Sequence, residues 1–222
     1  MQKWTVFFLL CCMSHAYCQN VGEAFVSLSD QIPSISLEIR YYSSDNFVGT
    51  RVDGYLQPKA LLTKEAALAL QKVQLALEKE GLGLKVFDAY RPQKGVNHFI
   101  RWAKLPADTL TKQKYYPTVD KKDVFRLGYV ASRSGHSRGS TLDLTLIKLE
   151  TGEELDMGSI WDFFGEISSH GSGQITAQQL QNRQKLKLKM EKFGFRAYSK
   201  EWWHYTLRNE PYPDTYFDFD IK

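Results

Sequence analysis

Two short segments, far apart in the chain, together contain the side chains that a catalytic metal site requires. Residues 134–143 read Ser-Gly-His-Ser-Arg-Gly-Ser-Thr-Leu-Asp, and residues 201–204 read Glu-Trp-Trp-His. Catalytic zinc takes three protein ligands and leaves a fourth position open, and a nearby carboxylate can serve as base. His136, Asp143 and His204 supply such a ligand set, which leaves Glu201 as the base. Any fold of this chain must therefore bring the two segments together.

The local patterns indicate how the first segment is held. The glycine-rich stretch around His136 is typical of a turn, whereas residues 141–146 (Thr-Leu-Asp-Leu-Thr-Leu) alternate with the period of a strand. One ligand should therefore lie on a loop and the next, Asp143, on a strand.

The second segment lies in a predicted hairpin formed by residues 195–198 and 201–207. On a regular strand, Glu201 and His204 point to opposite faces, because side chains alternate with period two. A bulge or a strand end is therefore needed to bring both side chains to one metal.

The remaining elements alternate irregularly between helix and strand. Thr63 is expected to cap a helix that ends at Gly81, and residues 84–88 read as a strand. Pro92 suits the first turn of the next helix. A long helix should begin at Thr176, where Gln179 completes a capping box, and should stop at Gly194. This order predicts an α+β domain with a mostly antiparallel central sheet flanked by helices and with the metal at the sheet face.

The length and the net charge of the chain limit the number of domains and the kinds of partner. The chain has 222 residues, no internal repeat and no low-complexity linker, so we expect one domain. The net charge of +4 is mild and evenly distributed, which argues against nucleic acid as a partner. No segment after the leader described next is long and apolar enough to span a membrane.

The N-terminus has the features of a secretory signal. Lys3 precedes an apolar stretch, and Ala16 and Cys18 are small residues at the −3 and −1 positions of a cleavage site before Gln19. We expect residues 1–18 to be a signal peptide and residues 19–222 to be the mature domain, exported to the bacterial periplasm. The alternative is a lipoprotein acylated at Cys18, although its neighbours suit that modification poorly.

All three cysteines lie in this leader, at positions 11, 12 and 18. The mature chain would therefore contain no disulfide despite export, and its stability must come from its core and its metal.

Taken together, the motifs resemble the D-alanyl-D-alanine dipeptidases, the zinc peptidases of vancomycin-resistance operons. The resemblance covers nearly the whole mature chain and is most specific in the two segments described above. It extends to residues 45–47, 52–55, 88–92, 128–132 and 210–213. It implies the fold shared by these peptidases and Hedgehog signalling domains.

The resemblance implies a role for each site residue. His136, Asp143 and His204 would hold one Zn²⁺ per subunit, Glu201 would move the proton of the attacking water, and Arg91 would bind the developing oxyanion. Two further contacts would hold the C-terminal carboxylate of a D-Ala-D-Ala substrate, from Ser134 and from the Tyr55 backbone. Asp162 would bind the free ammonium of the dipeptide.

One position departs from the family pattern. Thr141 stands where these peptidases usually have alanine, two residues before the aspartate ligand. Its hydroxyl could alter the hydrogen bonds around Asp143.

The sequence therefore predicts hydrolysis of D-Ala-D-Ala to two D-alanines, in cell-wall peptide turnover or scavenging outside the cytoplasm. One alternative is a D,D-carboxypeptidase that trims D-Ala from longer peptidoglycan peptides, which would need an open cleft near residues 158–173. Another is a non-catalytic, zinc-stabilised binding domain, which would need neither Glu201 nor Arg91. The sequence does not specify an oligomeric state.

Overall fold

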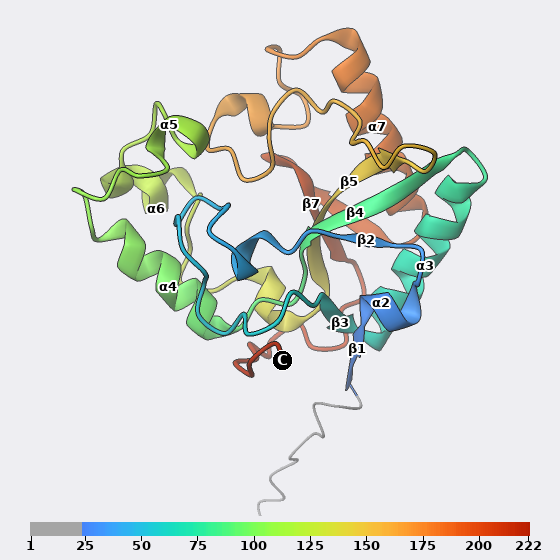
Figure 1. The fold of residues 1–222 in the computed structure, drawn as a ribbon, viewed down its shortest axis with the longest axis horizontal. Coiled ribbons are helices and arrows are strands. Elements are labelled where there is room, and N and C mark those ends of the chain that lie inside the picture. The colour runs from blue at the N-terminus through green and yellow to red at the C-terminus, as the bar shows by residue number, and fades with distance from the viewer. Residues whose placement is uncertain (1–23) are drawn as a thin grey trace, which may run out of the picture.

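A five-stranded mixed sheet forms the centre of the molecule (Figure 1). The structure, a computed structural model, describes residues 24–222, so the expected signal peptide (residues 1–18) lies outside the described residues. In spatial order the strands are β2 (Ser36–Leu37), β4 (Leu82–Asp88), β5 (Thr141–Lys148), β7 (Glu201–Leu207) and β6 (Phe195–Tyr198). The β2–β4 pair is parallel, and the β4–β5, β5–β7 and β6–β7 pairs are antiparallel.

Helices and a small second sheet surround this centre. The second sheet pairs β1 (Phe25–Ser27) with β3 (Leu61–Thr63). The α-helices are α2 (Leu28–Gln31), α3 (Lys64–Glu78), α4 (Gln93–Ala103), α5 (Lys112–Tyr115), α6 (Val124–Leu127) and α7 (Ala177–Lys192). The 3₁₀ turns are η1 (Arg40–Tyr42), η2 (Lys121–Asp123), η3 (Gly135–Arg138) and η4 (Glu166–Ser168). The α+β class is confirmed. Among residues 24–222, no helix combines the length and the apolar character needed to cross a membrane.

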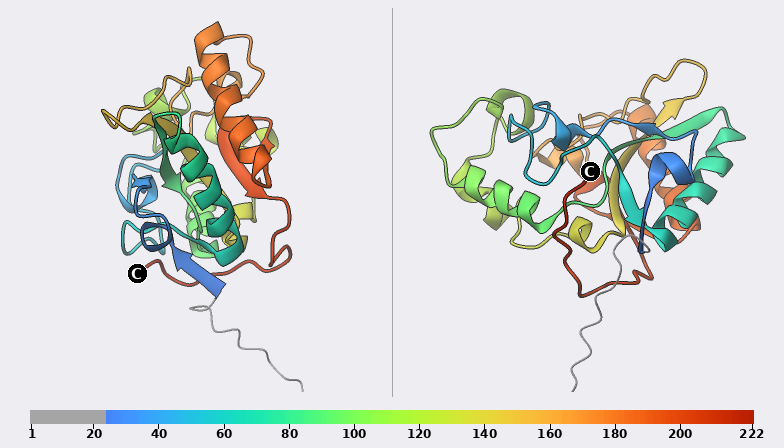
Figure 2. Two further views of the ribbon diagram at one scale, coloured as in Figure 1. Left: turned by 90° about the vertical axis from the view of Figure 1, so that its right-hand side faces the viewer. Right: turned by 60° about the horizontal axis from the view of Figure 1, so that its bottom comes forward.

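The long helices α3 and α7 pack against each other and against the sheet (Figure 2). The apolar stripe of α3 is fully buried at Leu70, Val73 and Leu77, and α7 buries Leu186 and Met190. Burial of one stripe per helix is the main source of stability for such elements, because isolated helices of this length are marginal in water. Helices α4, α5 and α6 lie at the other side of the molecule (Figure 1).

The helix ends agree with the sequence in part. Thr176 and Gln179 form the expected capping box of α7. Thr63 precedes α3 as expected, but its side chain does not cap the helix, so that prediction is wrong. The Thr63 hydroxyl is buried and hydrogen-bonds with the Ser140 hydroxyl instead (2.8 Å). The contact ties β3 to the start of β5. The short helices α5 and α6 are each only four residues long, too short for the sequence to show a helical period.

Two irregularities in the central sheet lie beside the predicted ligands. The β4–β5 register shifts between Val86 and Asp88, and the β6–β7 register shifts between Ala197 and Tyr198. The second shift pairs Tyr198 with Glu201, so the start of β7 departs from regular alternation. The sequence predicted a bulge or a strand end near Glu201, and the structure has a register shift there, with Glu201 as the first residue of β7.

Candidate metal centre and active site

Three acidic and imidazole side chains lie in one row across the sheet. Asp88 at the end of β4 pairs with Asp143 on β5, and Asp143 pairs with His204 on β7. Residues directly opposite each other in antiparallel strands have Cβ atoms only about 4.5–5.5 Å apart. The strand register alone therefore brings Asp143 and His204 within reach of one ion.

The third residue, His136, comes from η3, which precedes β5. Backbone hydrogen bonds tie this segment to its surroundings, from Arg91 N to His136 O (3.3 Å) and from Thr63 N to Gly139 O (2.8 Å). Gly139 has φ +80°, and a Cβ there would lie 2.3 Å from the Phe25 ring. Only glycine therefore fits at the end of this turn.

The ligand atoms form a nearly equilateral triangle. His136 Nε2 lies 3.3 Å from His204 Nδ1 and 3.4 Å from Asp143 Oδ1, and His204 Nδ1 lies 3.1 Å from Asp143 Oδ1. Atoms bound at about 2.0–2.1 Å to a tetrahedral zinc ion lie roughly 3.3 Å apart. The spacing therefore fits three ligands of a tetrahedral cation.

Hydrogen bonding and charge fit a cation as well. The His136 Nδ1–H donates to Ala89 O (2.8 Å), which leaves Nε2 unprotonated and directed at the centre. Asp143 Oδ1 is buried without a hydrogen-bond partner among the described residues. Burial alone would raise the pKa of Asp143, but the imidazoles of His136 and His204 hold that pKa well below its usual range. Asp143 is therefore ionised at neutral pH, the form in which a carboxylate can bind a metal.

Glu201 lies beside this centre without belonging to the triangle. Its Oε2 is 3.5 Å from His204 Nδ1, and its side chain is 23% exposed. Burial raises the pKa of Glu201 to about 7; His204 opposes the shift and Asp143 adds to it. A carboxyl with a pKa near neutrality can both accept and release a proton, which general acid–base catalysis requires.

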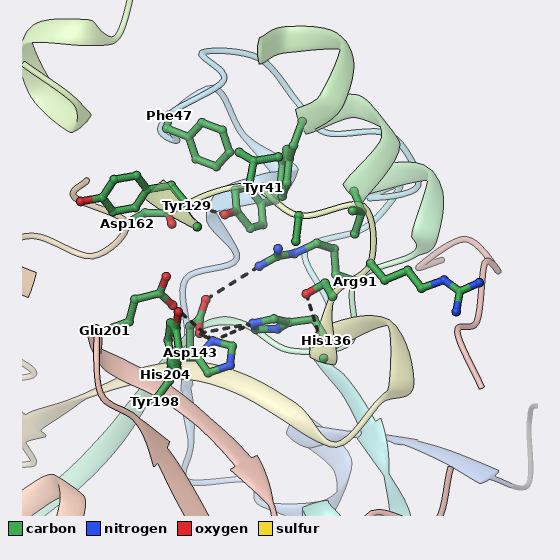
Figure 3. A pocket seen from close by; sticks show the side chains of 18 residues that line it. Tyr41, Phe47, Arg91, Tyr129, His136, Asp143, Asp162, Tyr198, Glu201 and His204 are labelled. Carbon is green, nitrogen blue, oxygen red and sulfur yellow. Dashed lines mark hydrogen bonds and ion pairs between the residues drawn. The ribbon is translucent and has the colours of Figure 1, made fainter. Parts of the chain in front are cut away.

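Arg91 approaches the centre from another direction (Figure 3). Its Nη2 lies 3.9 Å from Asp143 Oδ2. Both Nε and Nη2 donate to Asp88 Oδ2 (3.0 and 2.7 Å), and the guanidinium lies over the Tyr41 and Phe99 rings. Asp88 is fully buried and also accepts from the Tyr55 hydroxyl (2.6 Å). Arg91 is therefore fixed in orientation, with its charge balanced by Asp88.

Asp162 lines the same pocket and has φ +63°, an uncommon conformation for a residue other than glycine. It accepts a hydrogen bond from the Tyr41 hydroxyl (2.6 Å), and no cationic side chain among the described residues forms an ion pair with it. Burial raises the pKa of Asp162 well above its usual range, and Asp143 adds to this effect. A cation beside this carboxyl would favour its charged form and lower its pKa, so the position suits a cationic ligand.

Ser134 and Tyr55 differ in their positions. Ser134 lines the pocket, and its Oγ accepts from His136 N (3.3 Å), so its hydroxyl proton remains available to a ligand. Tyr55 is fully buried and does not line the pocket. Its N–H donates to Val52 O (3.2 Å). The expected contact between the Tyr55 backbone and a substrate therefore finds no support, and the Tyr55 side chain instead holds Asp88.

The hydroxyl of Thr141 does not reach the ligand that follows it. The Thr141 and Thr206 hydroxyls hydrogen-bond to each other (2.9 Å) across β5 and β7, two residue pairs before Asp143 and His204 in the ladder. The departure from the family pattern therefore adds a buried link between the two ligand-bearing strands.

All of the predicted site residues except Tyr55 line one pocket of about 240 Å³, namely His136, Asp143, His204, Glu201, Arg91, Asp162 and Ser134. Its wall combines the polar groups with apolar side chains such as Phe47, Phe99 and Val130. Drug-sized ligands occupy sites of about 300–1,000 Å³, so this pocket is suited to a smaller molecule.

Sequence patterns missed three residues of this site. Asp88 opens the Asp-Ala-Tyr-Arg-Pro motif, and its position three residues before Arg91 at a strand end could have identified it. Trp161 donates its indole N–H to Asp143 Oδ2 (3.2 Å), and Tyr41 contacts both Arg91 and Asp162. Both lie in segments without a periodic pattern, and no local signal distinguishes them.

Comparison with known proteins identifies the family. A family model described as D-Ala-D-Ala dipeptidase matches residues 22–222. The D-alanyl-D-alanine dipeptidase of Enterococcus faecium is 46% identical over 198 residues, which cover 89% of this chain and 98% of that protein. The protein of the same name from Escherichia coli is 34% identical over 182 residues, which cover 82% of this chain and 83% of the relative.

A solved structure of a vancomycin-resistance D,D-pentapeptidase in complex with Zn(II) is a more distant likeness. It is 15% identical and has a TM-score of 0.41, over 70% of this chain and 77% of that chain. The family assignment therefore depends on the sequence relatives and the family model. On that basis the chain belongs to the D-Ala-D-Ala dipeptidase family of peptidases.

Proposed function

We propose that this protein is a zinc dipeptidase that hydrolyses D-Ala-D-Ala to two D-alanines. The observation that carries the proposal is the placement of a three-ligand metal triangle, a carboxyl base and a second carboxyl without a cationic partner among the described residues in one small pocket. The relatives that bear the name D-alanyl-D-alanine dipeptidase support the substrate.

His136, Asp143 and His204 are the proposed zinc ligands. Two imidazoles and one carboxylate are a usual donor set for catalytic zinc, and their spacing suits a tetrahedral ion. Zinc bound there would lower the pKa of water to about 7 and polarise the scissile carbonyl.

Two side chains assist the reaction: Glu201 transfers the proton of the attacking water, and Arg91 stabilises the negative charge that develops on the carbonyl oxygen. Glu201 takes a proton from water as the oxygen attacks the carbonyl carbon, and then passes it to the leaving nitrogen as the C–N bond breaks. Arg91 donates hydrogen bonds to the carbonyl oxygen as negative charge develops there. The products are two molecules of D-alanine, and Glu201 returns to its starting state.

Both ends of the substrate have a proposed partner. The Ser134 hydroxyl donates to the C-terminal carboxylate, and Asp162 binds the free ammonium. A longer peptide has an amide in place of that ammonium, which would leave Asp162 with the Tyr41 hydroxyl as donor but without a cationic partner. This argument, together with the small volume of the pocket, favours a dipeptidase over a D,D-carboxypeptidase.

The decisive assay compares three substrates on the purified mature protein, with and without a chelator. We expect D-Ala-D-Ala to be cleaved, L-Ala-L-Ala and N-acetyl-D-Ala-D-Ala to be poor substrates, and the chelator to abolish turnover. Cleavage of the acetylated peptide at a comparable rate would favour the carboxypeptidase. Folding that requires zinc without any peptidase activity would favour a binding domain.

Trp161→Phe should weaken metal binding by roughly 10–100-fold, because partners of a ligand have effects of this size. The variant removes the indole N–H that orients Asp143, and the phenyl ring retains most of the packing. Titration with a competing chelator measures the zinc affinity. An unchanged affinity would show that the bond to Asp143 does not orient the ligand.

We also propose that residues 1–18 are removed on export and that residues 19–222 act outside the cytoplasm. There the enzyme would cleave dipeptides that are released in peptidoglycan turnover or scavenged as nutrients. Cell fractionation and the N-terminal sequence of the recovered protein test this. Activity confined to the cytoplasm, or a retained leader, would contradict it.

A further inference from the structure

The segment between β5 and α7, residues 149–176, contains only one short 3₁₀ turn, η4. We call it the 149–176 loop. It carries two adjacent residues of the site, because Trp161 bonds to Asp143 and Asp162 lines the pocket. A segment with so little regular structure needs other contacts to hold these two side chains in position at the site.

Those contacts come from one buried arginine of α7. Arg183 is fully buried, and its guanidinium donates to three backbone carbonyls of the 149–176 loop. Nε donates to Met157 O (2.6 Å), Nη1 to Ser169 O (2.7 Å) and Nη2 to Ile167 O (2.8 Å). The planar guanidinium suits this use, since its donors point in fixed directions.

Arg183 has no carboxylate partner among the described residues, so these carbonyl dipoles are the main compensation for its charge. Burial lowers the pKa of Arg183 to about 10, which still leaves it charged at neutral pH. Burying a cation without hydrogen bonds costs free energy of folding. The loop conformation that supplies the three carbonyls and the buried position of Arg183 therefore stabilise each other.

The three carbonyls lie on both sides of Asp162 in the sequence. Met157 precedes Asp162 and Ile167 follows it, each by five residues. Asp162 itself has the left-handed φ of +63°, which persists only where the surroundings impose it. The clamp on both flanks supplies such a constraint.

Other side chains of the same helix hold the beginning of the loop. Asn182 donates to Asp156 O (2.9 Å), and Gln179 donates to the Asp156 carboxylate (2.8 Å). Arg183 is the one residue of α7 that also reaches the part of the loop after Asp162, among the described contacts.

We propose that Arg183 is a positioning residue that sets the selectivity of the enzyme for a free amino terminus. It clamps both flanks of the 149–176 loop, so that Asp162 is held where the substrate ammonium arrives. The inference depends on the proposed dipeptidase function, and specifically on the pairing of Asp162 with that ammonium.

The test compares D-Ala-D-Ala with N-propionyl-D-alanine, which differs only by lacking the ammonium group. The readout is the ratio of the two kcat/KM values on one enzyme preparation. This ratio is independent of the fraction of active, zinc-loaded enzyme, so a general loss of stability does not change it. We expect Arg183→Lys to lower the ratio at least tenfold, because kcat/KM for D-Ala-D-Ala falls while kcat/KM for N-propionyl-D-alanine does not.

Three further variants make the result specific. Arg183→Gln, which buries no charge, provides a second replacement if Arg183→Lys does not fold. Met190→Ala loosens the same helix at a buried position seven residues after Arg183, and should leave the ratio unchanged. In an Asp162→Asn background, the Arg183 replacements should have no further effect on the ratio.

The outcomes separate the two proposals. If the wild-type enzyme does not favour the substrate with an ammonium group, Asp162 does not bind that ammonium, and this part of the proposed function is wrong. If the wild-type enzyme discriminates and the folded Arg183 variants discriminate equally well, Arg183 has no positioning role. An effect of equal size with and without the Asp162 carboxylate would likewise overturn it.

Discussion

Replacing Glu201 with glutamine is expected to lower kcat for D-Ala-D-Ala by about 10²–10⁴-fold. The amide retains the size of the side chain but cannot accept the proton of the attacking water. Glu201 is not one of the three residues whose side chains form the ligand triangle, so zinc content should remain near one per chain. Steady-state kinetics and metal analysis of the same preparation measure both quantities.

The stability of this variant provides a separate check. Burial disfavours the charged form of Glu201, as its raised pKa shows, and the Asp143 carboxylate adds repulsion. A neutral isostere removes both penalties, so Glu201→Gln should unfold at the same temperature as the wild type or above it. Loss of activity together with loss of zinc or of stability would contradict a role limited to catalysis.

The pH profile should report the same carboxyl. The base is active only when deprotonated, so kcat/KM should rise with pH up to the pKa of Glu201, which is about 7 without a metal. A dication beside it favours the charged form and lowers that pKa, which places the acid limb at or below pH 7. The limb should disappear from the residual activity of the glutamine variant.

The sequence singled out the three candidate ligands because each lies in a motif whose chemistry is local, and the structure brings their side chains together. His136 and Asp143 lie within one short run, and the alternation of residues 141–146 predicted a strand for Asp143. The irregularity near Glu201 was also predictable, since its carboxyl and the His204 imidazole could not otherwise face one ion.

Other parts of the site depend on long-range register that no local pattern encodes. Asp88 meets Asp143 because β4 shifts register after Val86, and a one-residue difference would move Asp88 to the other face. Arg183 likewise lies on α7, a helix that the sequence predicted. Nothing in the sequence of that helix indicates that one of its charged residues is buried. Its role is visible only once the 149–176 loop is folded over it.

Tyr55 is a predicted site residue whose position in the structure suits another role. The motif that contains it suggested a backbone contact with the substrate, but the structure already pairs its N–H with Val52 O. Its hydroxyl, which the sequence did not single out, bonds to the carboxylate that holds Arg91. A motif can therefore mark a residue that supports the site without touching the ligand.

Arg91→Lys should lower kcat/KM by about 10²–10³-fold, the usual effect of removing one oxyanion donor. Lysine keeps the positive charge beside the buried Asp88, which limits the loss of stability. It lacks the fixed donor directions of the guanidinium that lies over Tyr41 and Phe99. The substitution therefore tests the directed hydrogen bond more than the charge.

The distribution of this loss between the kinetic constants identifies its cause. A bond that forms only as the oxyanion develops lowers kcat and leaves KM nearly unchanged. The affinity for a phosphinate analogue of the tetrahedral intermediate should fall by a similar factor, because such an analogue presents the same charged oxygen. An increase in KM alone would instead assign Arg91 to ground-state binding of the substrate.

Arg40→Lys is the matched control for this substitution. Arg40 is also partly buried, bonded to carboxylates of Glu38 and Asp45 and placed over an aromatic ring, that of Phe87. It lies outside the pocket that contains the metal ligands. Arg40→Lys should therefore reproduce any general cost of exchanging a stacked, ion-paired arginine for lysine while kcat/KM stays near the wild-type value. Equal losses in the two variants would show that the Arg91 effect comes from packing, and a loss confined to Arg91→Lys would support its place at the oxyanion.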